Sequence, residues 1–153
     1  DANHGDDLIE IGIDPFNFSD ALLAIVAQRL SRRLCEKCKR PKKAGRAYYD
    51  ELIEVFHRET GAAPDILPTY TEANFMEAVG CDECRQTGYR GRIALHEMMI
   101  ATPAVKATIK SNADVEALKK VALHEGMWTL RMDGIMKVLK GYTDIDQVNK
   151  VSL

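Results

Sequence analysis

The sequence lacks long apolar runs and the short motifs of several enzyme classes. No apolar run in its 153 residues approaches the roughly 20 residues that a membrane-spanning helix needs, and no signal peptide is visible. A G-x-x-x-x-G-K-[ST] phosphate loop, a G-x-G-x-x-G turn and a nucleophile elbow are missing as well. The chain alone therefore offers no cradle for nucleotide phosphates and no activated serine.

Titratable side chains form no catalytic constellation either. The histidines at positions 4, 57, 96 and 124 are scattered without the spacing of a metal site. His96 and Glu97 offer an acid–base pair, but we interpret His96 as a packed residue, and His124 as a favourable charge near a helix end. By itself, the chain is not predicted to be a catalyst.

The chain also has little excess of charge of either sign, since its formal net charge is −2. Such a balance argues against extensive nucleic-acid binding. It is uneven, however, because one strong acid, Glu36, stands among eight bases: Arg32, Arg33, Lys37, Lys39, Arg40, Lys42, Lys43 and Arg46. Residues 47–80 reverse the pattern, with seven acids against Arg58. We interpret these acids as a solvated face, with pairing to the basic segment as the alternative.

Cysteine occurs only four times, in the pairs Cys35-x-x-Cys38 and Cys81-x-x-Cys84. Two such turns supply the four thiolates of a closed tetrahedral zinc site, which has no open position for a substrate. Zinc bound there contributes folding free energy, and the basic neighbours offset the negative charge of the thiolates. We predict structural zinc; redox dithiols or two free pairs remain alternatives. Thiols of this kind are typical of a reducing cytoplasm.

Apolar periodicity predicts an α+β chain that is mostly helical. A turn at 86–92 is expected to precede a strand at 93–99. The start and stop signals are Ser19, Gly61, Pro103, Gly126, Thr129, Gly141 and a Thr143-x-x-Asp146 capping box. Helices are expected over 19–34, 47–60, 71–78, 103–110, 114–125, 129–141 and 143–151.

Taken together, the motifs resemble those of a known family. In order they are Gly12-Ile13-Asp14-Pro15-Phe16, Ala27-Gln28-Arg29-Leu30, the first cysteine pair, Cys81-x-x-Cys84-x-x-Thr87-Gly88-Tyr89-Arg90-Gly91-Arg92, and Gly126-Met127-x-Thr129-Leu130-x-x-Asp133-Gly134. This set resembles the C-terminal part of the traffic ATPases of type II secretion and type IV pilus assembly, the GspE/PilB group. The resemblance covers nearly the whole chain, although the segment between the cysteine pairs is longer than the family leads us to expect.

The resemblance implies a division into three parts. Residues 1–34 would complete a RecA-like ATPase core, residues 35–91 would form a tetracysteine zinc-binding subdomain, and residues 92–153 a C-terminal helical subdomain. The parent would be a cytoplasmic hexamer, peripheral to the inner membrane, that binds ATP and Mg²⁺. It would power protein transport or pilus assembly through an inner-membrane platform protein. The family's Walker motifs and histidine box are expected upstream of Asp1, so the chain alone is expected to be inactive.

Two arginines become candidates through this resemblance. Arg92 and, second to it, Arg29 would contact the nucleotide or a neighbouring subunit, since a guanidinium matches phosphate geometry. A structural salt bridge is the alternative for each. Two other functions stay open at this point: a zinc-ribbon module that binds nucleic acid through the basic segment, and a free-standing scaffold. The basic segment has no aromatic interleaving, which disfavours the first.

Overall fold

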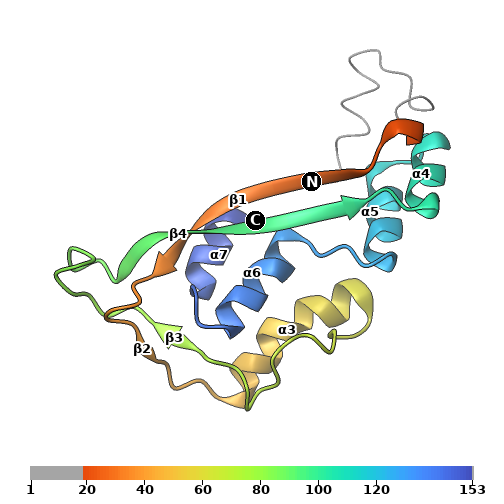
Figure 1. The fold of residues 1–153 in the computed structure, drawn as a ribbon. Helices are drawn as coiled ribbons and strands as arrows, with labels where there is room; N and C mark the ends of the chain where they lie inside the picture. Colours follow the sequence, from red (N-terminus) through yellow and green to blue (C-terminus); the bar gives the residue numbers. More distant parts are fainter. Residues whose placement is uncertain (1–18, 153) are drawn as a thin grey trace. The chain divides into compact units, whose positions relative to one another are not determined.

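The computed structural model describes residues 19–152, and Figure 1 shows its mixture of helices and strands. The elements are β1 (Ala24–Leu34), β2 (Arg40–Pro41), α3 (Arg46–Thr60), β3 (Met76–Glu77), β4 (Tyr89–Ile100), α4 (Pro103–Lys110), α5 (Val115–His124), α6 (Leu130–Leu139) and α7 (Ile145–Ser152). They fall into two compact units. Of the described residues, the first unit contains 19–27 and His96–Thr129, and the second contains Gln28–Leu95 and 130–152.

Strand β1 occupies most of the segment that was predicted as the helix 19–34. Residues 19–21 are helical, but Ala24–Leu34 is extended and pairs with β4, so that prediction is wrong. Apolar residues stand four apart at Leu22, Val26, Leu30 and Leu34, and a spacing of four suits both a helix and one face of a strand. Pairing with β4 decides between them. Within this spacing Leu34 is 0% exposed, whereas Val26 and Leu30 are 50% and 45% exposed.

Strand β4 confirms the predicted strand at 93–99 and extends it at both ends. The turn therefore ends earlier than predicted, because residues 89–92 already belong to the strand. Its pairing with β1 is antiparallel. The Cys35 N–H donates to the Gly88 carbonyl at 2.9 Å, and the Ala101 N–H donates to the Leu23 carbonyl at 3.0 Å. The beginning of β4 thus lies beside the end of β1, where both cysteine pairs are attached.

Helix α3 confirms the prediction for 47–60, and Gly61 ends it in the left-handed conformation at φ 85°. Its buried face consists of Tyr49, Leu52, Val55 and Phe56. The Tyr48 side chain next to this face is half-buried.

Helices α6 and α7 confirm the two predicted helices at the end of the chain and pack against each other. Their contact is close because Gly134 has no side chain: a Cβ there would stand 2.5 Å from Val148 Cγ1. The start of α7 differs from the prediction. Asp144 accepts the Gln147 N–H at 3.0 Å, while the Thr143 hydroxyl donates to the Arg32 carbonyl at 2.8 Å. The predicted Thr143-x-x-Asp146 capping box is therefore wrong, because the Thr143 hydroxyl bonds to β1 and Asp144 caps α7.

The predicted helix at 71–78 is also wrong. The chain turns at residues 70–72 and then forms β3, which pairs antiparallel with β2 in the register Arg40–Glu77 and Pro41–Met76. The Asn74 N–H donates to the Leu139 carbonyl at 2.8 Å. A helix of two turns is unfavourable because it forms few hydrogen bonds for the conformational entropy lost in nucleation. Tertiary hydrogen bonds of this kind therefore decide the conformation of this segment.

Helices α4 and α5 confirm the predictions for 103–110 and 114–125 in the first unit. Thr102 caps α4 by accepting the Val105 N–H at 3.2 Å, and Asp114 caps α5 by accepting the Ala117 N–H at 2.8 Å. Over residues 19–152, no helix is long and apolar enough to cross a membrane. The Gly12–Phe16 motif lies outside the described residues.

Candidate metal centre

The four cysteines converge from two distant stretches of chain. Cys35 follows β1, Cys38 ends the next turn, and Cys81 and Cys84 belong to the turn that precedes β4. All four sulfur atoms lie within 4.8 Å of one another, and none is in a disulfide. The structure therefore brings together the complete ligand set that the sequence predicted. Among the described residues, no histidine or carboxylate joins this cluster.

The distances between sulfurs match a tetrahedral zinc site. Cys35 and Cys38 each have a sulfur 3.8 Å from its counterpart across the site, Cys81 and Cys84 respectively. The sulfurs of Cys81 and Cys84 are 3.7 Å apart. With Zn–S bonds of about 2.3 Å, the edge of a sulfur tetrahedron is about 3.8 Å. A disulfide would need about 2.05 Å. The cluster consequently fits a metal ion and not a pair of disulfides.

Backbone amides surround the sulfurs and favour their charged form. The Cys84 sulfur accepts the N–H groups of Cys81 and Gly88, both at 3.2 Å, and the Cys38 sulfur accepts that of Gly80 at 3.3 Å. Burial opposes ionisation of Cys84, yet these amide bonds prevail and lower its pKa to about 6. One thiolate is thus favoured near neutral pH even before a metal adds its charge.

Cys81 shows the opposite shift. Its backbone hydrogen bond with Cys84 favours the thiolate, but burial and the neighbouring thiols outweigh it and raise the Cys81 pKa to about 11. Four sulfurs so close together cannot all ionise without a compensating charge. A divalent cation provides that charge, because a coordinating thiol loses its proton to the metal.

Gly88 shapes the second cysteine turn. Its φ is 82°, and a Cβ on it would stand 2.5 Å from the Cβ of Ala78. Arg85 and Gln86 of the same turn also have positive φ values, 55° and 63°. This backbone aims the Gly88 N–H at the Cys84 sulfur and its carbonyl at Cys35. Only glycine meets both requirements here without strain.

Comparison with known proteins identifies the family. The model of the family described as "Type II/IV secretion system protein" matches residues 6–150. The chain belongs to this family. The resemblance inferred from the motifs is therefore confirmed.

Curated relatives of this secretion family cover nearly all of the chain. It is 38% identical over 141 residues to the type IV pilus assembly ATPase PilB of Myxococcus xanthus, covering 92% of the chain and 23% of the relative. Identity to PilB of Thermus thermophilus is 35%, covering 92% of the chain and 15% of the relative. A putative type II secretion system protein E of Escherichia coli is 34% identical, covering 95% and 27%. The chain thus spans about a quarter or less of these relatives.

Most basic side chains around the metal centre contact aromatic rings, acids or carbonyl groups of the same chain. Four of the cations lie over tyrosine rings at 4.5–5.6 Å, in the pairs Arg32–Tyr89, Arg33–Tyr142, Lys42–Tyr48 and Arg46–Tyr70. Lys39 donates to Glu36 and to the Gly141 carbonyl, both at 2.9 Å. Each of these bases therefore has a structural contact within the chain.

The acids of residues 47–80 mostly face solvent, as interpreted. Ion pairs join two of the seven to the basic segment, Glu77 with Arg40 at 2.8 Å and Asp50 with Arg46 at 3.8 Å. Glu72 instead accepts the Thr69 N–H at 3.0 Å. The alternative of a mutual electrostatic contact is therefore realised only in part.

Arg29 and Arg92 lie on β1 and β4, outside the sulfur cluster. Both are exposed. Arg29 Nη1 donates to the Gln28 carbonyl at 2.9 Å, and the Arg92 side chain has no hydrogen bond or ion pair within residues 19–152. Their contacts with a nucleotide or a neighbouring subunit stay predictions.

Tyr89 and Asp144, which join the metal centre to the start of α7, were not predicted from the sequence. The Tyr89 hydroxyl donates to Asp144, while Arg32 covers the ring of the same tyrosine. Burial, reinforced by Asp144, raises the Tyr89 pKa to about 12, so the hydroxyl keeps its proton. The motif Thr87-Gly88-Tyr89 was used for the resemblance alone. Its position directly after a cysteine pair was the signal that it supports the site.

Proposed function

We propose that the chain is the zinc-binding C-terminal portion of a secretion or pilus-assembly ATPase. The observation that carries this proposal is the spacing of the four sulfurs within a chain of this family. Cys35, Cys38, Cys81 and Cys84 would hold one structural zinc ion, which would supply positive charge to the thiolates. The site fastens the end of β1 to the beginning of β4, the two strands to which the cysteine turns are attached.

The metal has a structural role in this proposal because all four positions of a tetrahedral ion would be filled by protein sulfur. Such a site has no place for a water or substrate molecule. What the chain's own residues provide is a pre-shaped cage: amides of Cys81 and Gly88 stabilise one thiolate, and the left-handed turn directs them. The result is a fixed geometry between two strands and not a reaction centre.

In the parent protein, we assign to the chain a supporting part in ATP hydrolysis by a hexamer. ATP and Mg²⁺ would bind outside this chain, whose residues 1–34 would complete the RecA-like core. Residues 35–91 would form the zinc-binding subdomain and residues 92–153 the helical subdomain. Arg92, and second to it Arg29, would contact the nucleotide or the next subunit. The machine would act from the cytoplasm on an inner-membrane platform protein.

Two measurements test this proposal. Protein made without added metal should contain about one equivalent of zinc by elemental analysis, and a Cys38→Ser/Cys81→Ser variant should contain none. The isolated chain should release no phosphate from ATP above a buffer control. Protein without zinc, of unchanged thermal stability, would refute the metal assignment. Phosphate release that persists through further purification would refute the supporting role.

Arg92 is tested in the full-length parent. If it contacts the nucleotide or a neighbouring subunit, Arg92→Ala should lower the ATPase rate at least tenfold, which corresponds to about 1.4 kcal/mol. Arg92→Lys keeps the charge and removes the planar guanidinium, so the ATPase rate of this variant should also be low. Zinc content should stay normal in both. Unchanged rates in both variants would reduce Arg92 to a surface residue.

A further inference from the structure

The metal centre borders the short segment between α6 and α7, residues 140–144, which we call the α6–α7 link. Two hydrogen bonds attach this link to the end of β1, directly before the first cysteine pair. The Leu34 N–H donates to the Tyr142 carbonyl at 2.9 Å, and the Thr143 hydroxyl donates to the Arg32 carbonyl at 2.8 Å. Leu34 and Thr143 are both 0% exposed, so each donor would be left without a partner if its bond broke.

The first cysteine turn supplies a positive charge to the end of α6. Lys39 follows Cys38, and its backbone N–H donates to the Cys35 carbonyl at 2.9 Å. Its Nζ donates to the Gly141 carbonyl at 2.9 Å, and the side chain is only 12% exposed. A cation at the C-terminus of a helix is favoured by the helix dipole. This contact therefore depends on the conformation of the turn that Cys35 and Cys38 form.

The second cysteine turn contacts the start of α7. Gly88, whose N–H donates to the Cys84 sulfur, is followed by Tyr89, and the Tyr89 hydroxyl donates to Asp144 Oδ2. The other carboxylate oxygen of Asp144 accepts the Gln147 N–H at 3.0 Å and so caps α7. One carboxylate therefore connects the metal centre with the first turn of α7.

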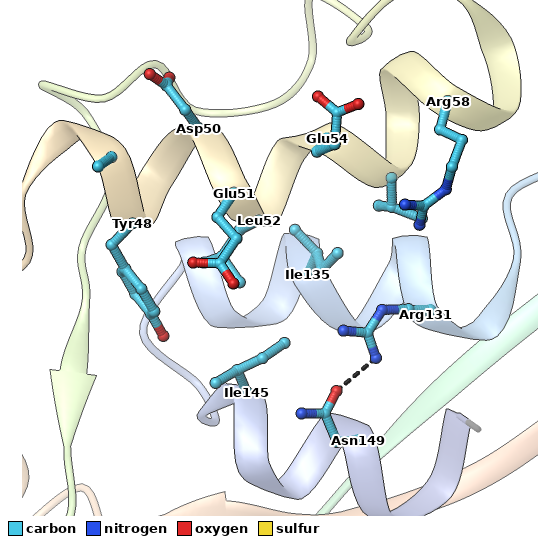
Figure 2. Close-up of a pocket in the computed structure, with 12 residues that line it drawn as sticks. Tyr48, Asp50, Glu51, Leu52, Glu54, Arg58, Arg131, Ile135, Ile145 and Asn149 are labelled. Atoms are coloured by element: carbon cyan, nitrogen blue, oxygen red, sulfur yellow. Dashed lines mark hydrogen bonds between the residues drawn. The ribbon is translucent and has the colours of Figure 1, made fainter.

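The later part of α7 is held by α6 instead. Figure 2 shows the hydrogen bond that Arg131 of α6 donates to Asn149 of α7. Val148 is 0% exposed and lies against Gly134 of α6. None of these four residues belongs to a cysteine turn. Helix α7 thus consists of a first turn that contacts the metal centre and a remainder that contacts α6.

We propose that the α6–α7 link responds to the occupancy of the metal centre: the link and the first turn of α7 are ordered when the four sulfurs share a divalent cation, and they open when the cation is lost. Strands β2 and β3 pair over two residues each, which is too little to hold the cysteine turns without the metal. When the turns separate, Lys39 leaves the Gly141 carbonyl and Tyr89 leaves Asp144. The inference rests on the proposed zinc binding and adds to it a conformational response of α7.

The first measurement is hydrogen exchange of the whole chain, with zinc bound and after its removal by a chelator under reducing conditions. Without zinc, the amides of residues 142–147 should exchange at least about tenfold faster, because the link loses the partners that the cysteine turns provide. The amides of residues 132–138 in α6 should exchange at an unchanged rate. Zinc added back should restore the slow exchange of residues 142–147.

The second measurement uses the reciprocity of coupled equilibria: a change on the α7 side of the link must alter the affinity for zinc. Asp144→Asn keeps one side-chain oxygen to cap α7 and loses the oxygen that accepts the Tyr89 hydroxyl. Its affinity for zinc, measured by competition with a chelator, should fall about fivefold, because the lost bond forms only in the zinc-bound chain. Asn149→Ala is the matched control, since it removes a hydrogen bond of the same helix to α6 and should leave this affinity unchanged.

Three results would overturn the inference and leave the proposed zinc binding intact. One is slow exchange at residues 142–147 after zinc removal, while residues 35–42 open. Another is an equal affinity of Asp144→Asn and the parent chain for zinc. The third is exchange that rises equally in α6, because the metal would then support the entire unit and not the link. A chain that binds no zinc would refute the proposed function itself, and this inference with it.

Discussion

The metal centre and the α6–α7 pair, both in the second unit, are stabilised by different means. Around the cysteines, β2 and β3 have two residues each, and their pairing joins only Arg40–Pro41 to Met76–Glu77. Helices α6 and α7 instead bury Met132, Leu139 and Val148 completely. Elements too short to bury a core require another source of stability, and four converging sulfurs offer one.

The largest effect is expected when the metal centre alone is disrupted. Removing the metal with a chelator, or replacing Cys81 with Ser, should expose the amides of residues 35–42 and 74–88 to hydrogen exchange. The amides of α6 should stay protected. Structural zinc binds small peptides with roughly 10–16 kcal/mol, so the local loss should amount to several kcal/mol. Exchange that rises equally in both regions would show that the zinc supports the whole unit.

The reciprocal change weakens the helical pair. Met132 is 0% exposed, so Met132→Ala should lower the free energy of unfolding by about 2–5 kcal/mol, because it leaves a cavity. Zinc content should stay at one equivalent. Met98→Ala is the matched control, since Met98 is 46% exposed and its loss should cost under about 0.5 kcal/mol. Similar losses for the two variants in urea titrations would refute the distinction between core and surface.

A pair of glycines separates backbone strain from close packing. Gly61 and Gly88 have φ values of 85° and 82°, but nothing lies within 4 Å of a Cβ at Gly61, whereas one at Gly88 would meet Ala78 at 2.5 Å. Alanine at either position should lower the free energy of unfolding by about 1–2 kcal/mol, because a residue with a Cβ is strained in the left-handed conformation. Gly88→Ala should cost about 1–3 kcal/mol more and weaken zinc binding in a competition titration. Equal costs, with equal zinc affinity, would contradict the role of Gly88.

The smallest expected effect concerns the ion pair between the exposed Glu36 and Lys39, whose side chain is only 12% exposed. Their hydrogen bond of 2.9 Å lowers the pKa of Glu36 below its usual range. A carboxyl whose pKa is lower in the folded state stabilises the protein above its unfolded pKa, and this contribution disappears as the pH falls through the folded value. Glu36→Gln should therefore cost under about 1 kcal/mol at pH 7 and nothing at low pH. A difference from the parent chain that grows on acidification would contradict this.

Sequence predicts those features that depend on residues close together in the chain. Gly61, Pro103 and Gly126 mark helix ends through local backbone chemistry, and the paired cysteines indicate a shared site through their spacing. Strand β1 was missed because a spacing of four residues suits both helix and strand. Only its partner β4, some sixty residues away, selects between them. The hydrogen bond between Tyr89 and Asp144 could not be predicted, since these residues are 55 positions apart in the chain.

X-ray absorption at the zinc edge tests the central claim most directly. Protein purified without added metal is expected to show one zinc ion with four sulfur neighbours at about 2.3 Å and no nitrogen or oxygen in the first shell. That result corresponds to the separations of 3.7 and 3.8 Å between the sulfurs. A first shell with fewer than four sulfurs, or protein that folds equally well with no metal, would contradict the account.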